Sequence, residues 1–386
     1  MLTHFPIKPL LAEQRDQGRY RELTCVETGV TPTIQVDGKT YVNFASNDYL
    51  GLATEPALSQ ALIQASQQHP QIGSGASHLI TGHSIYHDQL ANTLAQAAGY
   101  DKALTFSTGY MANVAILQAL CSKDTVIFSD KLNHASIVDG TILSRAKVVR
   151  FAHRDYTSLE KRLQHTTNAQ KLIITDHIFS MDGTIADLRQ LAQLAKYYEA
   201  ALVIDDAHGF GLPYQAYKDD PLLPKADIYM GTLGKAIGTS GAFVAGSPTL
   251  IEYLINTARP YIYTTAMPPI LARVTTAAVN LAMTDTNRSQ QLINNIRQLS
   301  EGLSAQGWQV GIDDEPIKTA IIPVMIGDNA QAVALAAQLK AQGFWVSAIR
   351  PPTVPVGTAR LRFCVSSVHT PQQIGALLAV MQNLIV

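Results

Sequence analysis

The chain has 386 residues, of which 47% are hydrophobic, and a formal net charge of −1. This length exceeds what one hydrophobic core usually organises, so we expect a large domain and a smaller one. The balanced charge argues against nucleic acid as a partner, and the sequence has no run of eighteen apolar residues that would indicate a membrane span.

Residues 1–45 open the chain, and we expect them to form an N-terminal helix and a β-hairpin. The hairpin is predicted over TIQVDGKTYVNF, residues 33–44, with its turn at Asp37-Gly38. The first twenty residues lack the uninterrupted apolar core of a signal peptide. This segment therefore predicts a cytoplasmic protein.

Cys25, Cys121 and Cys364 are scattered along the chain without the spacing of a metal or redox motif. Such a set suits the reducing cytoplasm, where thiols stay free. We expect the three side chains to pack in the core, and we expect no metal site.

Short apolar runs alternate with helical patterns over residues 46–287, as is typical of a doubly wound α/β domain with a mostly parallel sheet. One helix is predicted over residues 84–99, between Ser84 as its cap and Gly99 as its stop. The predicted strands are residues 102–106, 124–128, 146–151, 171–175, 200–205 and 241–246.

Residues 288–386 repeat the helix and strand patterns on a smaller scale. Helical stretches such as NAQAVALAAQLKAQG alternate with apolar strands such as TAIIPVMI and ARLRFCV. The pattern predicts a smaller C-terminal α/β domain.

Ligands of an open parallel sheet bind beyond the carboxyl ends of its strands. The strand over 102–106 is followed by a Ser-Thr-Gly-Tyr stretch, ending at Gly109 and Tyr110, and then by a helical pattern. Free N–H groups at a helix start are typical of an anion site, although an ordinary capped helix has the same pattern.

Acidic and histidine residues follow three other predicted strands. They are Asp205 with His208, Asp176 with His177, and His134. A carboxylate at such a position could hold a ring nitrogen in its protonated form. A capping role for the carboxylate and a structural role for each histidine remain open alternatives.

Lys235 lies in YMGTLGKAIGTSGAFVAG, residues 229–246, between two apolar runs. Its small, uncharged neighbours leave room for a ligand. A partly desolvated ammonium has a depressed pKa and becomes a nucleophile, as in lysines that form Schiff bases with carbonyl cofactors. A solvated loop lysine is the alternative interpretation.

Familiar nucleotide and hydrolase motifs are excluded here. The phosphate-loop pattern fails because Tyr229 replaces its first glycine and Ala236 its hydroxyl residue. The dinucleotide pattern fails where Tyr214 and His78 replace its last glycine, and the nucleophile-elbow pattern fails at Leu79.

An anion site, an aspartate, a histidine and a lysine are what pyridoxal 5′-phosphate requires. Over nearly the whole chain the sequence resembles the α-oxoamine synthases, a family of fold-type I pyridoxal-phosphate enzymes. The motifs that carry the resemblance are SNDYLGL (46–52), GSGASHLITG (73–82), STGYMAN (107–113), FSMDG (179–183), DDAHGFG (205–211), TLGKAIGTSGAF (232–243) and IYTTAMPP (262–269).

The resemblance implies a fold-type I transferase and a role for each matching cofactor residue. Lys235 would carry the cofactor, Asp205 would pair with its ring nitrogen, and His134 would stack on the ring. Ser180 and His208 would contact its phenolic oxygen. The residues implied in catalysis are Lys235, His134, Asp205 and His208, and those on the phosphate side are Gly109, Tyr110, Thr232 and, from a partner subunit, Thr265.

The resemblance also implies substrate contacts and a homodimer with shared active sites. Asn47 and Arg362 would bind the amino-acid carboxylate, and the small Ser77 would leave room for a methyl group. Arg21, Arg350 and Thr353 would line the acyl region. Two positions depart from the usual motifs, since Asp176 replaces a common glutamate and His78 a common arginine.

Within the family, AIRPPTVPVGTARLRF (348–363) resembles the branch that condenses L-alanine with pimeloyl-CoA or a pimeloyl-acyl-carrier protein to make a precursor of biotin. Glycine C-acetyltransferase, 5-aminolaevulinate synthase and serine palmitoyltransferase are the alternatives within the family. A non-catalytic regulatory protein that binds the cofactor is the alternative from another class.

Overall fold

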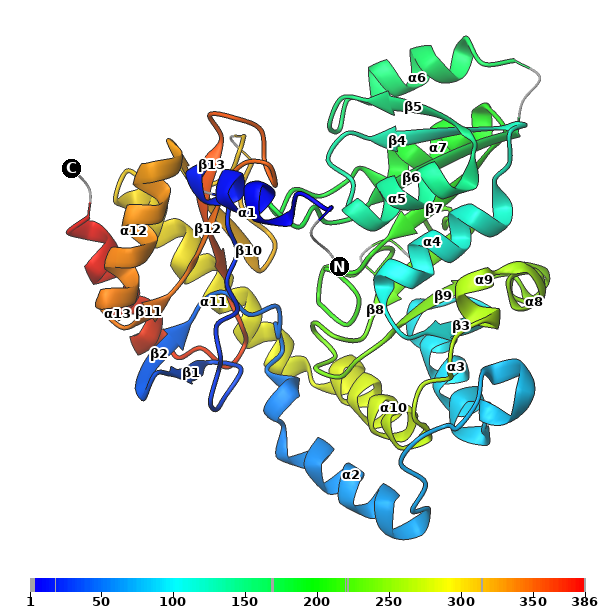
Figure 1. Ribbon diagram of the computed structural model, residues 1–386, viewed down its shortest axis with the longest axis horizontal. Helices are drawn as coiled ribbons and strands as arrows, with labels where there is room; N and C mark the ends of the chain where they lie inside the picture. Colours follow the sequence, from blue (N-terminus) through cyan, green and yellow to red (C-terminus); the bar gives the residue numbers. More distant parts are fainter. Residues whose placement is uncertain are drawn as a thin grey trace.

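The computed structural model describes residues 4–17, 19–167, 170–218, 220, 222–313 and 315–384. Three β-sheets and the helices around them form two bodies of unequal size joined by α10 and α11 (Figure 1). The mixed α/β architecture with one large sheet confirms the predicted fold class.

The large body is built on a seven-stranded sheet in the order β3-β9-β8-β7-β6-β4-β5. β9 runs antiparallel to both of its neighbours, and the strands from β8 to β5 run parallel to one another. The strands are β3 (Lys102–Phe106), β4 (Thr125–Asp130), β5 (Lys147–Phe151), β6 (Gln170–Asp176), β7 (Ala200–Asp205), β8 (Ile228–Thr232) and β9 (Ala242–Gly246). Each of the six strands predicted from apolar runs is present.

Alternate strand residues face two separate cores, which is why the apolar runs are continuous. Ile173 of β6 faces one core, and its neighbours Leu172 and Ile174 face the other. The first core is covered by α3 (Ile85–Ala98), α6 (Tyr156–Gln164), α7 (Leu188–Tyr197) and α10 (Pro269–Thr284). The second is covered by α4 (Gly109–Leu120), α5 (Ala135–Ser144), α8 (Pro248–Thr257) and α9 (Arg259–Ile262).

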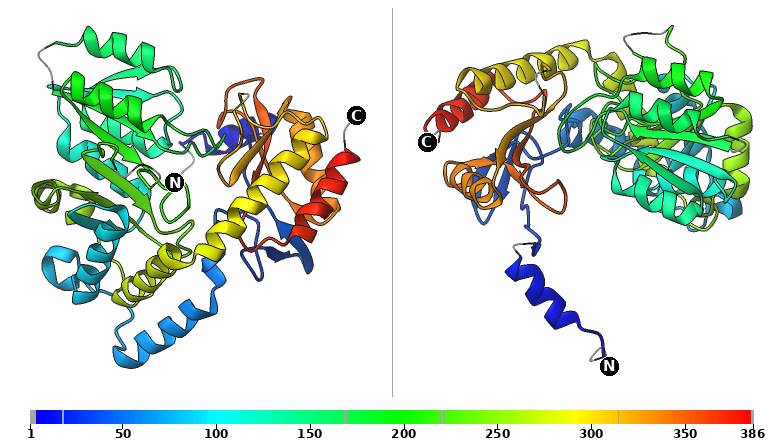
Figure 2. Two further views of the ribbon diagram at one scale, coloured as in Figure 1. Left: turned by 180° about the vertical axis from the view of Figure 1, so that it is seen from behind. Right: turned by 90° about the horizontal axis from the view of Figure 1, so that it is seen from above.

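The small body combines both ends of the chain (Figure 2). Antiparallel β13 (Ala359–Cys364) lies between β10 (Ile321–Gly327) and β12 (Ser347–Ile349). A second sheet pairs β1 (Thr33–Val36) with β2 (Lys39–Asn43), and β2 with β11 (Phe344–Trp345). Its helices are α11 (Thr286–Ala305), α12 (Asn329–Ala341) and α13 (Pro371–Gln382).

The predicted hairpin and the predicted helix cap are both confirmed. Asp37 and Gly38 have φ angles of 51° and 70°, the left-handed values that a two-residue hairpin turn requires. Ser84 is the N-cap of α3, and Gly99 ends it in the left-handed conformation. Helix α2 (Pro56–Gln68) follows the short 3₁₀-helix η1 (Leu52–Thr54), and the short π-helix η2 (His78–Gly82) precedes α3.

The division of the chain at residues 45/46 and 287/288 stays a prediction. The large sheet lies wholly inside residues 46–287. Pairing of β2 with β11, however, joins the predicted N-terminal segment to the predicted C-terminal domain in one sheet.

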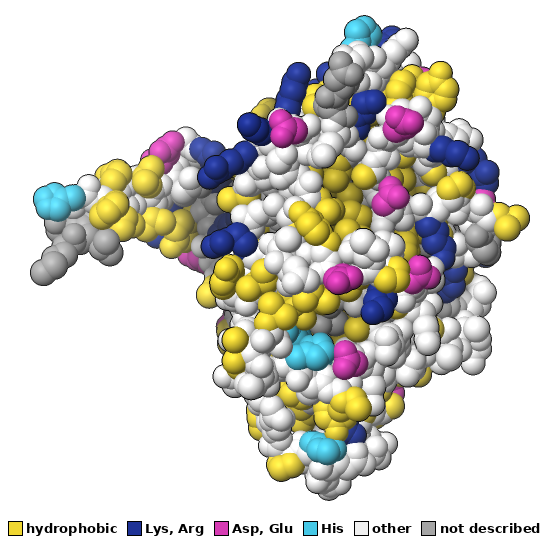
Figure 3. Space-filling view, turned by 90° about the vertical axis from the view of Figure 1, so that its right-hand side faces the viewer, with side chains coloured by type: hydrophobic (Ala, Val, Ile, Leu, Met, Phe, Trp, Pro, Cys, Tyr) yellow, Lys and Arg dark blue, Asp and Glu magenta, His cyan; other side chains and the backbone are white. Residues whose placement is uncertain are grey.

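Helix α1 (Ile7–Asp16) stands away from both bodies and buries none of its residues (Figure 3). Phe5, Ile7, Leu10 and Leu11 are exposed along this arm. No helix in the described ranges is long and apolar enough to cross a membrane.

Candidate active site

Four neighbouring strands bring their carboxyl ends to one edge of the large sheet. β4, β6, β7 and β8 are adjacent in the sheet order. His134 follows β4, Asp176 ends β6, Asp205 ends β7 and Lys235 follows β8. The structure therefore brings together residues that are far apart in the sequence, at the edge where such sheets bind ligands.

Lys235 lies in the loop that connects β8 to β9. Gly238 N–H donates to Lys235 O at 2.9 Å and closes a tight turn. Gly238 has a φ of +68°, and a Cβ added to it would lie 2.4 Å from Ala53 N. Glycine is required here, because the turn needs the left-handed conformation and packs directly on the backbone before α2.

The amine of Lys235 lies 2.6 Å from His208 Nε2. Burial lowers the pKa of Lys235 to about 8, although the nearby carboxylates of Asp205 and Asp176 favour its charged form. A substantial share of the amine is therefore neutral near pH 8, as a nucleophile or a proton acceptor requires.

A hydrogen-bond chain continues from His208 to Asn47. His208 Nδ1 lies 2.8 Å from Tyr49 Oη, and Tyr49 donates to Asn47 Oδ1 at 3.0 Å. Because the tyrosine proton points to Asn47, Nδ1 of His208 carries a proton and Nε2 accepts from Lys235. Burial and the charge of Lys235 hold the pKa of His208 well below its usual value, so the ring is neutral.

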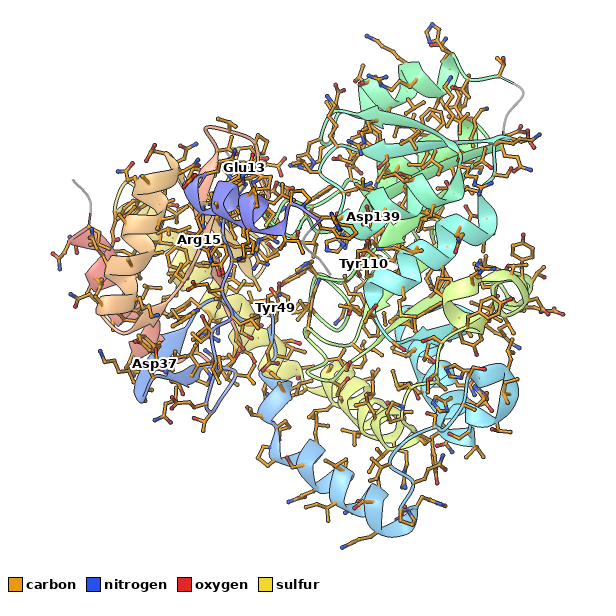
Figure 4. The ribbon with its side chains drawn as sticks, viewed as in Figure 1. Glu13, Arg15, Asp37, Tyr49, Tyr110 and Asp139 are labelled. Carbon is orange, nitrogen blue, oxygen red and sulfur yellow. The ribbon has the colours of Figure 1, made fainter. Side chains whose placement is uncertain are left out.

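Arg362 of β13 extends this chain into the small body. Its Nη2 donates to Asn47 Oδ1 at 3.1 Å, and its Nε donates to Ser180 O at 2.6 Å. The side chain is buried. Asn47 Oδ1 accepts from Tyr49, Arg362 and the Cys364 thiol, which leaves the amide Nδ2 of Asn47 to donate to a ligand beside the guanidinium. Figure 4 shows Tyr49 between the two bodies.

Asp205 is buried and bound by two uncharged donors. Asn113 Nδ2 donates to Oδ2 at 2.7 Å, and Ala207 N–H donates to Oδ1 at 2.9 Å. Burial raises the pKa of Asp205 above its usual value. A protonated ring nitrogen would supply the positive charge that this buried carboxylate favours, so the site fits a pyridinium ring.

His134 is tied to Asp205 through two other side chains. Asn113 also donates to Ser136 Oγ at 2.9 Å, and Ser136 Oγ lies 2.7 Å from His134 Nδ1. The backbone N–H of His134 donates to Asp176 Oδ2 at 2.8 Å. Burial lowers the pKa of His134, so the imidazole is neutral. Burial also raises the pKa of Asp176 well above its usual value and so favours the neutral form of that carboxyl group.

Asp206 has a different environment from its neighbour Asp205. It accepts from Tyr229 Oη at 2.7 Å and from Ala216 N–H at 2.9 Å, and it lies 2.7 Å from His177 Nδ1. These three partners are structural groups of the large body, so Asp206 supports the fold beneath the site.

The start of α4 is the predicted anion site. Thr108 Oγ1 accepts a hydrogen bond from the N–H of Met111, and Thr108 O accepts one from the N–H of Ala112. The N–H groups of Gly109 and Tyr110 lie in the first turn of the helix, so they have no intrahelical acceptor. A Cβ added to Gly109 would lie 3.9 Å from Thr232 Oγ1, so the hydroxyl faces this glycine. Tyr110 is exposed and bonds Asp139 of α5 through its hydroxyl (Figure 4).

Several predicted residues lie outside this network. Ser77 and Thr265 form an isolated β-bridge with each other, and Thr265 is exposed. Arg21 is exposed on the segment after α1. Arg350 and Thr353 lie on the loop between β12 and β13, where Thr353 N–H donates to Arg350 O at 3.1 Å. The predicted roles of these five residues, like those of the residues inside the network, stay predictions.

Sequence reasoning assigned no role to Tyr49 or Asn113, although both lie within motifs of the resemblance. Tyr49 connects His208 to Asn47, and Asn113 connects Asp205 to Ser136. Their positions within SNDYLGL and STGYMAN were the available signal.

Two surface grooves of about 680 and 690 Å³ contain none of these residues. The first lies at the opposite edge of the sheet, beside Tyr100 and Asp227, and the second lies beside Arg297 of α11. The site is therefore located by its chemistry and its place on the sheet, and not by the size of a groove.

Comparisons with known proteins agree with this geometry. The family model for class I and II aminotransferases matches residues 39–381. The 8-amino-7-oxononanoate synthase of Hydrogenovibrio crunogenus is 48% identical over 377 residues, covering 96% of this chain and 94% of that protein. That of Cellvibrio japonicus is 45% identical, covering 96% and 93%.

The chain belongs to the 8-amino-7-oxononanoate synthase family. This family lies within the class I and II aminotransferases.

Solved structures of two related enzymes share this fold. Serine palmitoyltransferase from S. paucimobilis, solved with a bound PLP-myriocin aldimine, superposes with a TM-score of 0.92 at 30% identity, covering 100% of this chain and 98% of that chain. The 8-amino-7-oxononanoate synthase from Francisella tularensis superposes with a TM-score of 0.76 at 29% identity, covering 89% and 97%.

The lowered pKa of Lys235 predicts an unusual reactivity profile. In the cofactor-free protein, acylation of Lys235 by an amine reagent should rise with pH through about 8, because the neutral amine is the reacting form. Competitive labelling followed by peptide mass spectrometry measures the midpoint.

The matched control is Asp205→Asn, which removes a carboxylate that favours the ammonium and should move the midpoint to lower pH. A midpoint near 10.5, the value of a free lysine, would contradict the buried setting of this amine.

Proposed function

We propose that this protein condenses L-alanine with a pimeloyl thioester, giving 8-amino-7-oxononanoate, carbon dioxide and a free thiol, as a step of biotin biosynthesis. The observation that carries this proposal is the hydrogen-bond chain from Lys235 through His208, Tyr49 and Asn47 to Arg362. Through this chain of contacts, the amine of Lys235, whose pKa is lowered, and the guanidinium of Arg362 belong to one site. An amino-acid substrate needs both, because one group acts at its α-carbon and the other binds its carboxylate.

Pyridoxal 5′-phosphate is the cofactor, and the residues on the sheet edge fit each part of it. Its aldehyde condenses with amines, and its ring accepts the electron pair that is left when the α-carbon of an amino acid loses a proton. We propose these positions for the groups that would hold it: Gly109, Tyr110 and Thr232 at the phosphate, Asp205 at the ring nitrogen, His134 against the ring face, Ser180 and His208 at the phenolic oxygen, and Lys235 at the aldehyde carbon.

Lys235 and His208 together control a proton. Lys235 Nζ takes the proton from the α-carbon of alanine and later returns it, as a general base whose pKa of about 8 lies near the working pH. His208 Nε2 accepts a hydrogen bond from this amine at 2.6 Å and so orients its lone pair. The neutral state of His208 keeps a second positive charge away from Lys235.

Arg362 and Asn47 bind the carboxylate of alanine. A guanidinium offers parallel donors to a planar carboxylate, and Asn47 Nδ2 adds a third donor. The contact of Arg362 with Ser180 O fixes the direction of its plane. After the new carbon–carbon bond forms and the carbon–sulfur bond breaks, this carboxylate leaves as carbon dioxide.

The acyl donor is pimeloyl-CoA or a pimeloyl-acyl-carrier protein, and we propose that Arg21, Arg350 and Thr353 bind it. Two prolines follow Arg350 and restrict the backbone of the loop before β13. A restricted loop presents an arginine to a carboxylate at a lower entropic cost. Pimeloyl chains carry a terminal carboxylate that such an arginine would bind.

A panel of amino acids and acyl thioesters tests the proposal. L-alanine with pimeloyl thioester should give the highest kcat/KM, with release of carbon dioxide and thiol. The TM-score of 0.92 to serine palmitoyltransferase makes L-serine with palmitoyl-CoA the second candidate. Higher turnover of that pair, or of glycine with acetyl-CoA, would contradict the proposed substrates.

Two arginine variants sharpen this panel. Arg362→Lys keeps the charge but loses the paired donors, and should raise the KM for alanine about tenfold or more. Arg350→Ala should instead raise mainly the KM for the acyl donor. Equal effects of both changes on both substrates would refute the separate roles of these residues.

Asp205→Asn and Asp206→Asn form a matched pair of neighbouring substitutions. Asp205→Asn should lower kcat about a hundredfold or more, because the ring nitrogen loses its anionic partner, and should affect turnover more than stability. Asp206→Asn disturbs a fully buried network and should lower the free energy of unfolding by about 1–3 kcal/mol.

The two readouts are kcat of the loaded enzyme and urea unfolding of each variant. Near-normal turnover of Asp205→Asn would assign the ring nitrogen to another group.

We propose that the working unit is a homodimer in which Thr265 reaches the phosphate of the partner's cofactor. The exposed apolar arm of α1, with Phe5, Ile7, Leu10 and Leu11, supports a contact with a second copy. Because Thr265 is bridged to Ser77, both residues would lie at the same subunit boundary. Cys121 and Cys364 are buried as predicted, but Cys25 is exposed, so the prediction that it packs in the core is wrong. All three cysteines are free thiols, which supports a cytoplasmic location.

Mixed dimers test the shared site. Lys235→Ala and Thr265→Ala chains, each of low activity alone, should regain activity when they are mixed and exchange subunits, because some hybrids hold one intact site. Mixing two batches of the Lys235→Ala chain is the control. A fully active monomer in sedimentation would contradict the proposal.

A further inference from the structure

Three histidines gather at the start of α3, outside the network of Lys235. His78 begins η2, His83 follows η2, and His87 lies in the first turn of α3. One ring nitrogen of each lies within 4.8 Å of the others. The prediction of no metal site was based on the spacing of the cysteines, and this cluster consists of histidines alone.

The hydrogen bonds of His83 determine which of its nitrogens carries a lone pair. His83 Nε2 lies 3.0 Å from Asp88 Oδ1, so Nε2 carries the proton and donates to the carboxylate. Its Nδ1 therefore has the lone pair, and it lies 2.8 Å from His78 Nδ1. Two Nδ1 atoms thus face each other.

His87 is oriented in the same way by a backbone carbonyl. Its Nε2 lies 2.7 Å from Met267 O and must donate to it, which leaves the lone pair on Nδ1. This Nδ1 faces Ser84, whose N–H lies at 3.0 Å and whose Oγ lies at 2.9 Å. A carboxylate and a carbonyl therefore hold the far nitrogens of two rings, as is typical of metal-bound histidines.

Packing holds the rings in place and leaves one side open. His78 stacks on Tyr261 with ring centroids 4.8 Å apart, and His87 is fully buried. The side chain of His83 is 38% exposed, which gives an ion a path from solvent. Packing therefore holds the buried side of the cluster in place, and the cluster is open to solvent at His83.

We propose that His78, His83 and His87 bind one divalent transition-metal ion of the Zn²⁺ class through their Nδ1 atoms. Imidazole nitrogen is a preferred ligand of this class, and three protein ligands leave a fourth position for water. Tetrahedral ligation at about 2.0–2.1 Å separates ligand nitrogens by about 3.3 Å, so His78 and His83 move apart slightly and His87, whose nitrogen lies within 4.8 Å of theirs, draws closer. The ion replaces the hydrogen bonds of Ser84 at His87 Nδ1.

The ion would tie η2 to α3 one residue away from Ser77. Ser77 is the N-cap of η2 and bridges Thr265. This site is separate from Lys235 and does not depend on the reaction.

Equilibrium dialysis of the holoenzyme against Zn²⁺ tests the proposal, with metal content and visible absorption of the Co²⁺-substituted protein as readouts. The protein should bind one ion per chain and show the intense bands of four-coordinate Co²⁺. His83→Gln should lose this ion. Asp88→Asn, which changes only a positioning residue, should weaken affinity about 10–100-fold.

The matched control is His165→Gln, an exposed histidine at the end of α6, which should retain the ion. Thermal unfolding shows that each variant is folded. Failure of the holoenzyme to bind an ion, or unchanged binding in His83→Gln, would overturn the proposal without affecting the proposed function.

Discussion

The hydrogen bond of 2.6 Å between Lys235 and His208 is the contact on which the active site depends. Burial favours a neutral amine, and the carboxylates of Asp205 and Asp176 favour a charged one. Because these two effects oppose each other, the pKa of Lys235 is about 8. The adjacent parallel strands β6 and β7 end in Asp176 and Asp205, and this register places both carboxyl groups beside a lysine from the loop after β8.

The strand positions could be predicted because runs buried on both faces are continuously apolar, and the motifs located most of the site. Contacts across the chain could not be predicted in the same way. Tyr49 and His208 are separated by 159 positions. Asp205 and Asp206 are chemically identical in sequence, and only the turn of the backbone after β7 directs one to Asn113 and the other to Tyr229.

The contact between Arg362 and Asn47, which would bind the amino-acid carboxylate, could not be predicted from strand patterns. Arg362 and Asn47 are 315 positions apart, and Arg362 belongs to the small body while Ser180 belongs to the large one. The position of this guanidinium therefore depends on how the two bodies pack. A pattern of apolar residues carries no information about that packing, so the role of Arg362 came from resemblance alone.

Pairing of β2 with β11 also has a consequence for how the protein is made. Val42 N–H donates to Gly343 O, and the neighbouring Phe44 accepts from Cys364 N–H. The first hairpin leaves the ribosome on the order of tens of seconds before these partners are synthesised. Until then its outer edge is unpaired, so the nascent chain presents an open strand that chaperones can protect and that other nascent chains can join.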